Sequence, residues 1–199
     1  MKVLIMPYPV AHVLFFVFCI SAAAVYAITR SIFRRELSLR DSIQILLLLS
    51  IGSLSALLPD VPAIYNLIVN GGSGHCWIGP VPTHSFLFSF SAFMYGTLAG
   101  LIAYGKFSKA IYLGIFAEAA FLSHLLLDDA HEGSCTYLYP IYNKSISVFS
   151  LMNVSFYENG LFNYLIKSFL SVFFFCFVIM MALFALNQLG FEFKYRSKK

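Results

Sequence analysis

The sequence predicts an all-α fold: a polytopic membrane helix bundle with about five transmembrane helices and a His/Asp site at one membrane face. Hydrophobic residues make up 60% of the chain and charged residues only 11%, unlike the composition of a soluble domain. The charges lie in clusters beside long apolar runs, as the charges that flank membrane helices do. With 199 residues, the chain is expected to form a single integral membrane domain.

Five apolar runs are long enough, or nearly so, to cross a bilayer, which takes about 20 helical residues. They cover residues 10–28, 43–58, 86–104, 110–127 and 161–189. The first run ends on small residues, as a signal peptide does, but its apolar core exceeds the roughly 7–15 residues of such a peptide. Its basic residues also follow the run instead of preceding it, so we interpret it as a retained span.

Two of the runs have distinctive ends. Pro59 is expected to end the second span, because proline pushes the residue before it away from helical dihedral angles. Asp60 then lies at a break in the helix and is free to turn inward. Thr83 or a neighbour is expected to cap the third span, which places His84 in the first turn of that helix.

The basic residues predict the topology. The loops after the first and third spans, together with the C-terminal tail, carry ten of the 13 Lys and Arg residues. With five spans these segments share one face, which the positive-inside rule assigns to the cytoplasm. The N-terminus and the site then lie on the outer side of the cell or inner membrane. No basic patch is interleaved with aromatic residues, so we predict no nucleic-acid partner.

The parity of the spans brings imidazole and carboxylate groups to the face away from the basic loops. The second span ends at Asp60, the third begins next to His84, and the fourth ends with His124 and Asp128. The last two are four residues apart, so their side chains lie one helical turn from each other on the same face. By the same parity, His12, Asp129 and Glu158 are expected to lie at this membrane face.

Two imidazoles and two carboxylates at one membrane surface predict a divalent metal site. The predicted metal ligands are Asp60, His84, His124 and Asp128, with His12 as a further candidate. Mixed nitrogen and oxygen ligands favour Zn²⁺, with Mn²⁺ or Fe²⁺ as alternatives, over Ca²⁺. Such an ion lowers the pKa of a coordinated water toward about 7. Either the metal-bound hydroxide or a nearby acid, with Asp129 and Glu158 as the candidates, would serve as the catalytic base.

Short motifs around these residues resemble those of the YdjM-like family of membrane-bound metal-dependent hydrolases. The motifs are Ala11–Phe15, Leu57–Asp60, Thr83–Ser85, Ser123–Asp128, Tyr139-Pro140 and Glu158. The resemblance implies hydrolysis of a phosphoester, because that family is thought to be distantly similar to zinc-dependent phospholipase C and P1-type nucleases. It also implies one metal on the four ligands named above, with His12 and Glu158 serving a second metal or supporting the first.

The chain departs from the family pattern at two points. Val61-Pro62 follows Asp60 where the family has Pro-Asp-x-Asp, so the second acid is missing. Gly79–Pro82 precedes Thr83 where the family has a His-Arg-Gly stretch. Two alternatives to a hydrolase therefore stay open: a metal-binding or ion-transporting membrane protein, and a membrane scaffold that has lost activity.

Residues away from these motifs carry further predictions. Glu118 lies in the middle of the fourth span, where we expect a protonated acid hydrogen-bonded to another helix, with an ion path as the alternative. Cys76 and Cys135 can form a disulfide in an oxidising compartment. An aromatic belt at headgroup depth is predicted from Trp77, Tyr137, Tyr139 and Tyr142. Membrane lipids are the predicted partners, with a phospholipid or another phosphoester as substrate.

Overall fold

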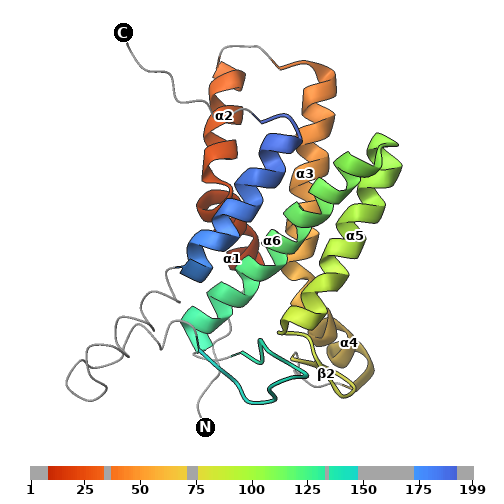
Figure 1. Cartoon of the computed structure of the whole chain (residues 1–199), viewed down its shortest axis with the longest axis vertical. Helices are drawn as coiled ribbons and strands as arrows, with labels where there is room; N and C mark the ends of the chain where they lie inside the picture. Colours follow the sequence, from red (N-terminus) through yellow and green to blue (C-terminus); the bar gives the residue numbers. More distant parts are fainter. Residues whose placement is uncertain (1–8, 34–36, 71–75, 133–134, 148–172, 192–199) are drawn as a thin grey trace, which may run out of the picture.

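The structure, a computed structural model, describes residues 9–33, 37–70, 76–132, 135–147 and 173–191. Within these ranges the helices are α1 (Pro9–Leu14), the π-helix η1 (Phe15–Ile20), α2 (Ala22–Phe33), α3 (Leu39–Leu57), the 3-10 turn η2 (Leu58–Asp60), α4 (Val61–Asn70), α5 (Phe86–Tyr104), α6 (Phe107–Glu132) and a last helix, Phe173–Gln188. A small antiparallel hairpin joins β1 (Trp77–Ile78) to β2 (Val81–Pro82). The helices form one bundle (Figure 1), and the predicted all-α class is confirmed.

Three helical stretches are long and apolar enough to cross a membrane: Leu39–Ala63, Phe86–Tyr104 and Phe107–Asp129. The first predicted span is long and apolar enough only if its two bent halves form one span, so the described residues contain three or four such helices. The last helix is shorter, and the part of the predicted fifth span before it lies outside the described residues. These helices are consistent with an integral membrane protein.

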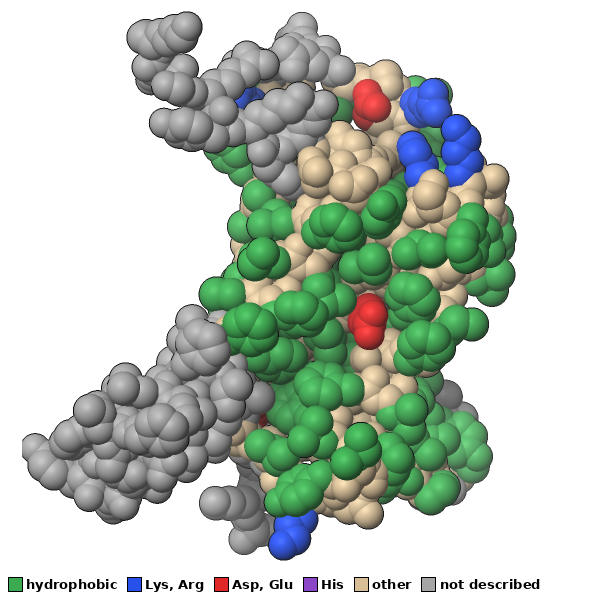
Figure 2. All heavy atoms as spheres, viewed as in Figure 1, with side chains coloured by type: hydrophobic (Ala, Val, Ile, Leu, Met, Phe, Trp, Pro, Cys, Tyr) green, Lys and Arg blue, Asp and Glu red, His purple; other side chains and the backbone are tan. Residues whose placement is uncertain are grey.

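Hydrophobic side chains cover most of the middle of the visible face, and Lys and Arg side chains gather at one end of it (Figure 2). The exposed Arg30 and Arg40 lie in the last turn of α2 and the first turn of α3, and the exposed Lys106 lies in the turn between α5 and α6. Those turns lie at the end of the bundle opposite α4 and the hairpin (Figure 1). For the described residues, the predicted separation of basic residues from the site face therefore holds along the bundle axis.

The first predicted span is not a straight helix, contrary to expectation. Its two halves meet at Ser21 with a bend of 77°. The Ser21 N–H donates to the Phe16 carbonyl at 2.9 Å, five residues back, as in a π-helix. The ring of Phe16 packs edge-on against Phe116 and over Gly52, where a Cβ would lie 2.5 Å from the Phe16 ring. The bend is accommodated by this packing, since the span contains no proline or glycine at that point.

The second predicted span continues past Pro59, which was expected to end it. A capping box between Ser38 and Asp41 starts α3, and the helix ends at Leu57. Pro59 then occupies the first turn of η2, where its missing N–H is not needed, and α4 follows directly. Asp60 nevertheless lies at the break, as predicted, because it is the last residue of the 3-10 turn.

The start of α5 corrects the expected position of His84. Ser85 is the N-cap, with an extended backbone and a side chain that accepts from the Phe88 N–H at 3.2 Å. His84 therefore precedes the helix instead of lying in its first turn. The helix ends at Tyr104, before Gly105 in the left-handed region with φ of 61°, and its bounds match the predicted third span.

Small residues hold α5 close to α6. A Cβ on Gly96 would lie 2.5 Å from the Ala117 Cβ, and one on Gly100 would lie 2.6 Å from the Ala110 Cα. Such close approach of backbones is the usual packing of membrane helices, where van der Waals contact replaces the hydrophobic effect. About 72% of the apolar window of α6 is buried, against 22% for α5, so α6 is the core helix of the bundle.

Candidate metal centre

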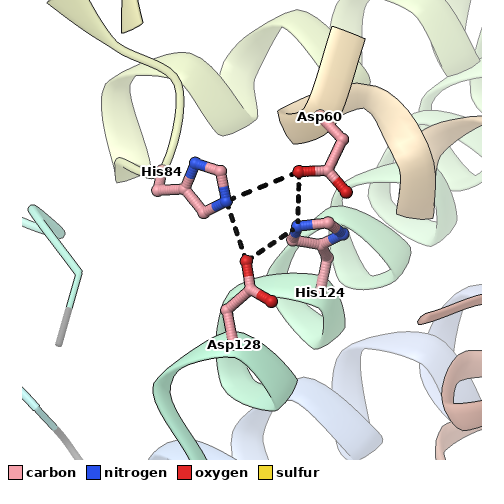
Figure 3. A group of neighbouring side chains, drawn as sticks. All are labelled: Asp60, His84, His124 and Asp128. Atoms are coloured by element: carbon pink, nitrogen blue, oxygen red, sulfur yellow. Dashed lines mark hydrogen bonds and ion pairs between the residues drawn. The ribbon is translucent and has the colours of Figure 1, made fainter. Parts of the chain in front are cut away.

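Four of the predicted ligands converge at the end of the bundle away from the basic turns. Asp60 comes from η2, His84 from the segment before α5, and His124 and Asp128 from successive turns of α6 (Figure 3). One ligand atom from each lies within 4.8 Å of the others. The side chains are almost fully enclosed: the exposed fraction is 9% for Asp60, 4% for His84, 0% for His124 and 3% for Asp128.

The ligand atoms lie near the spacing that a tetrahedral ion needs. Asp128 Oδ2 lies 2.8 Å from His84 Nε2 and 3.1 Å from His124 Nε2. Asp60 Oδ1 lies 3.6 Å from His124 Nε2 and 3.9 Å from His84 Nε2. Ligands bound at about 2.1 Å in a tetrahedron are about 3.4 Å apart. Small shifts of these side chains therefore suffice to accommodate one ion.

The hydrogen bond of His124 determines which of its nitrogens faces the centre. His124 Nδ1 lies 2.6 Å from the Ala56 carbonyl oxygen, which can only accept, so Nδ1 carries the proton. In a neutral imidazole the other nitrogen, Nε2, then has a lone pair instead of a hydrogen. This lone pair points toward the carboxylates of Asp60 and Asp128. Fixing the tautomer through a carbonyl is the usual support of a metal-binding histidine.

An arrangement of acceptors facing acceptors favours a cation between them. Among the described residues, neither His124 Nε2 nor Asp60 Oδ1 has a hydrogen-bond partner, although both atoms are buried. Leaving such polar atoms unpaired costs about 1–3 kcal/mol each, and more when a charge is involved. A divalent ion bound to two imidazoles and two carboxylates removes that cost. The four residues therefore form a buried group that can hold a metal ion.

His12 lies beside this group but is not one of the four converging residues. Its Nε2 contacts Asp128 Oδ1 at 3.2 Å, so the other carboxylate oxygen remains for the centre. Its ring stacks on that of His124, with centroids 3.7 Å apart and planes inclined by 16°. Asp128 thus contacts three histidines. The bent first span brings His12 here, and its direct role as a metal ligand stays a prediction.

Asp129 is buried next to the centre, with an exposed fraction of 1%. Its Oδ2 accepts a hydrogen bond of 3.0 Å from the hydroxyl of Tyr137. Tyr137 itself is 2% exposed, so its assignment to an aromatic belt is wrong, whereas Trp77 and Tyr142 are exposed. Sequence reasoning missed this pairing because only the folding of the chain after α6 brings the ring inward. Glu158, the other predicted base, lies outside the described residues.

Cys135 is a buried thiol whose Sγ lies 3.9 Å from the Leu125 carbonyl oxygen. The disulfide to Cys76 is therefore not formed within the part of the chain that the structure describes. Burial raises the pKa of the Cys135 thiol well above its usual range, and the nearby carboxylates of Asp128 and Asp129 raise it further. The thiol stays protonated at neutral pH and is a poor nucleophile.

Glu118 lies six residues before His124 on α6. Its Oε1 accepts a hydrogen bond of 3.2 Å from the hydroxyl of Ser89 on α5. The acid therefore bonds to another helix, as the sequence predicts for an ionisable residue within a span. It is not part of the group that can hold the ion.

Comparison with known proteins adds no assignment. No protein-family model matches the chain, and neither a curated protein nor a solved structure is found to be similar to it. The resemblance to YdjM-like hydrolases thus stays a prediction from short motifs.

Proposed function

We propose that the chain is a membrane-bound, metal-dependent hydrolase that acts on a phosphoester. The observation that carries this proposal is the contact of the His124 Nε2 lone pair with two carboxylates in a buried site. A site built only for stability has no need for that arrangement, because replacing buried charges by apolar groups is often neutral or stabilising. The motifs shared with YdjM-like hydrolases favour the same chemistry.

The ligands that would hold the ion are Asp60, His84, His124 and Asp128. When bound there, a divalent cation supplies a Lewis acid that acidifies a coordinated water and polarises a phosphoryl oxygen. Two imidazoles and two carboxylates suit Zn²⁺, with Mn²⁺ or Fe²⁺ as alternatives. His12 would orient Asp128 through Oδ1, and the Ala56 carbonyl would keep His124 in the tautomer that presents Nε2.

The position of the site favours a substrate that is available at a membrane surface. The ligands lie where α3 and α6 approach their ends, at the end of the bundle that carries α4 and the hairpin (Figure 1). Tyr65 on α4 and Trp77 on β1 are exposed. Tryptophan and tyrosine prefer the interface between lipid and water. A phosphoester of a membrane lipid is therefore the substrate class to test first, and the outer side of the membrane is the proposed location.

The proposed function predicts metal-dependent hydrolysis by the purified protein. Protein in detergent or liposomes is assayed with Zn²⁺ or Mn²⁺ against chromogenic phosphodiesters and phospholipids. Hydrolysis should be lost with a chelator and restored by the metal, and His84→Ala should lose it by at least about 10³-fold. Glu118→Gln, on the same helix as two ligands, is the control that should retain activity. Wild-type protein that binds the metal stoichiometrically but hydrolyses none of these esters would contradict the proposal.

An ion-transporting protein is the second candidate, and the Glu118–Ser89 hydrogen bond between α5 and α6 is the observation that favours it. Ionisable residues within spans often mark ion or proton paths. In liposomes with an imposed metal or proton gradient, transport should then depend on Glu118. Flux that Glu118→Gln abolishes, without any hydrolysis, would favour this candidate. Hydrolysis that is unchanged in Glu118→Gln favours the enzyme.

A further inference from the structure

The segment that follows α6 folds back over the start of α5. Cys135 and Ile146 pair as an isolated antiparallel bridge, which closes the loop between them. Thr136 and Tyr137 lie at the beginning of this loop. Both contact the short stretch that carries His84 and the start of α5, and the Tyr137 side chain is buried, with an exposed fraction of 2%.

Tyr137 binds the helix that carries two of the ligands. Its hydroxyl lies 3.0 Å from Asp129 Oδ2 and 3.2 Å from the Leu125 carbonyl oxygen, both on α6. Burial raises the pKa of Tyr137 above its usual range, and the nearby carboxylate of Asp129 adds to the effect. The hydroxyl thus keeps its proton and serves as a donor. Asp129 adjoins Asp128, so this anchor lies one residue from a ligand.

The same residue also binds the start of α5. The Tyr137 carbonyl accepts a hydrogen bond of 2.9 Å from the Phe86 N–H, one of the donors that a helix start leaves without a helical partner. The rings of Tyr137 and Phe86 pack with centroids 5.4 Å apart. Thr136 Oγ1 lies 3.4 Å from the His84 carbonyl oxygen. Three contacts therefore hold the His84 segment against this loop.

We propose that Tyr137, anchored by Asp129, is a positioning residue that holds His84 in register with Asp128 at the metal centre. The inference rests on the proposed function for its metal. In this proposal Asp129 is not a catalytic base. Its carboxylate accepts a hydrogen bond from the Tyr137 hydroxyl and does not remove a proton from water. Partners of this kind typically contribute 10–100-fold to metal affinity.

The proposal is tested by the Zn²⁺ affinity of the full chain in detergent, which is measured by competition with a chelator. Tyr137→Phe removes only the hydroxyl and should weaken Zn²⁺ binding by about 10-fold or more. Tyr139→Phe, in the same loop and less buried, is the matched control and should stay within about twofold of the wild type. Equal affinity of the Tyr137→Phe and wild-type proteins would overturn the proposal.

The Asp129→Asn variant distinguishes an anchoring role of Asp129 from a role as catalytic base. The amide oxygen of asparagine can still accept the Tyr137 hydrogen bond, so an anchoring residue should tolerate the change in both Zn²⁺ affinity and hydrolysis. A catalytic base loses hydrolysis by about 10²–10⁴-fold with Zn²⁺ affinity unchanged, since its carboxylate takes the proton. That second pattern would assign Asp129 to the chemistry and overturn the anchoring role.

A readout without metal keeps this inference distinct from the proposed function. In metal-free protein, amide hydrogen exchange of residues 84–88 should be faster in Tyr137→Phe than in the wild type and in Tyr139→Phe. The backbone carbonyl of residue 137 still accepts from the Phe86 N–H, but without the hydroxyl it is no longer anchored to α6. If the wild-type protein binds no Zn²⁺ but the variants show this difference in exchange, the proposed metal-dependent hydrolase is rejected and the positioning role of Tyr137 is retained. Unchanged exchange in Tyr137→Phe would reject the positioning role of Tyr137, whatever the metal content of the protein.

Discussion

The α5–α6 pair and the first two hydrophobic stretches contribute to the same site in opposite ways. α5 and α6 are unbroken helices of 19 and 26 residues. The stretches before them are both interrupted, one by a 77° bend after a π-helix and the other by the 3-10 turn η2. The unbroken α6 supplies His124 and Asp128, and the interrupted stretches supply His12 and Asp60.

The difference shows how a membrane bundle can gather buried polar groups. A regular helix places His124 and Asp128 on one face without any distortion, because residues four apart are neighbours. At the end of a straight helix, the direction of a side chain is fixed by the helix axis. The breaks at Ser21 and Pro59 change the direction of the chain, so that side chains can point into the interior. Interruptions of helices at membrane depth are tolerated where they line an internal site.

The largest effect is expected on the unbroken side, from Asp128→Asn. This change keeps the size of the side chain but removes the charge that three histidines contact. Zn²⁺ affinity should fall by more than about 100-fold, beyond the loss typical of residues that only support a ligand. Chelator competition measures the effect, with Glu118→Gln as the control on the same helix. A loss below 10-fold would show that Asp128 is not a ligand.

The packing of the α5–α6 pair is tested by Gly96→Leu. The side chain would collide with Ala117 and with the Leu113 carbonyl oxygen, so overpacking should lower the free energy of unfolding by about 1–3 kcal/mol. Zn²⁺ affinity should fall with it, because α5 positions the His84 segment. Denaturation in detergent measures stability, and Ala103→Leu at an exposed position of α5 is the control. Equal stability of the two variants would contradict the close packing.

Pro59→Ala tests the interrupted side. Alanine is compatible with a helix, so stability should change by less than about 1 kcal/mol. The backbone of η2 should become more helical and move Asp60 away from His124, which should weaken Zn²⁺ binding by about 10-fold. We therefore expect Pro59→Ala to lower Zn²⁺ affinity without lowering stability, whereas Gly96→Leu should lower both. Unchanged Zn²⁺ affinity in Pro59→Ala would show that the break is not needed to direct Asp60.

The smallest effect is expected at the cap of α5. Ser85→Ala removes the acceptor of the Phe88 N–H and should cost about 1 kcal/mol of stability. Ser91→Ala is the matched control, since its exposed hydroxyl bonds only the carbonyl of its own helix at Phe88. The thermal midpoints of the two variants in detergent provide the measurement, and an equal decrease in both would argue against a specific role of the cap.

Much of the regular part of the fold could be predicted from the sequence. The run 86–104 is continuous and ends before Gly105, so its bounds as a helix match those of α5. Asp60, His84, His124 and Asp128 could be brought together by counting the sides of the membrane, because each lies near the end of an apolar run. That argument needs no contact between particular side chains.

The irregular parts could not be predicted, because tertiary packing decides them. No residue of the first span signals the bend at Ser21, which depends on the fit of Phe16 against Gly52 and Phe116. Thr83 and Ser85 are equally good caps in sequence, and the choice of Ser85 leaves His84 before the helix. From the sequence, Tyr137 is predicted to be an interfacial aromatic residue, but in the structure its side chain is buried in the segment after α6.

X-ray absorption at the zinc edge of the Zn²⁺-loaded protein tests the central claim most directly. We expect about one ion per chain, with two imidazole nitrogens and two carboxylate oxygens at about 2.0–2.2 Å. The imidazole scattering should decrease in His124→Ala. A spectrum with an oxygen-only shell, or one that is identical in wild-type and His124→Ala protein, would contradict the assignment of Asp60, His84, His124 and Asp128 to one metal.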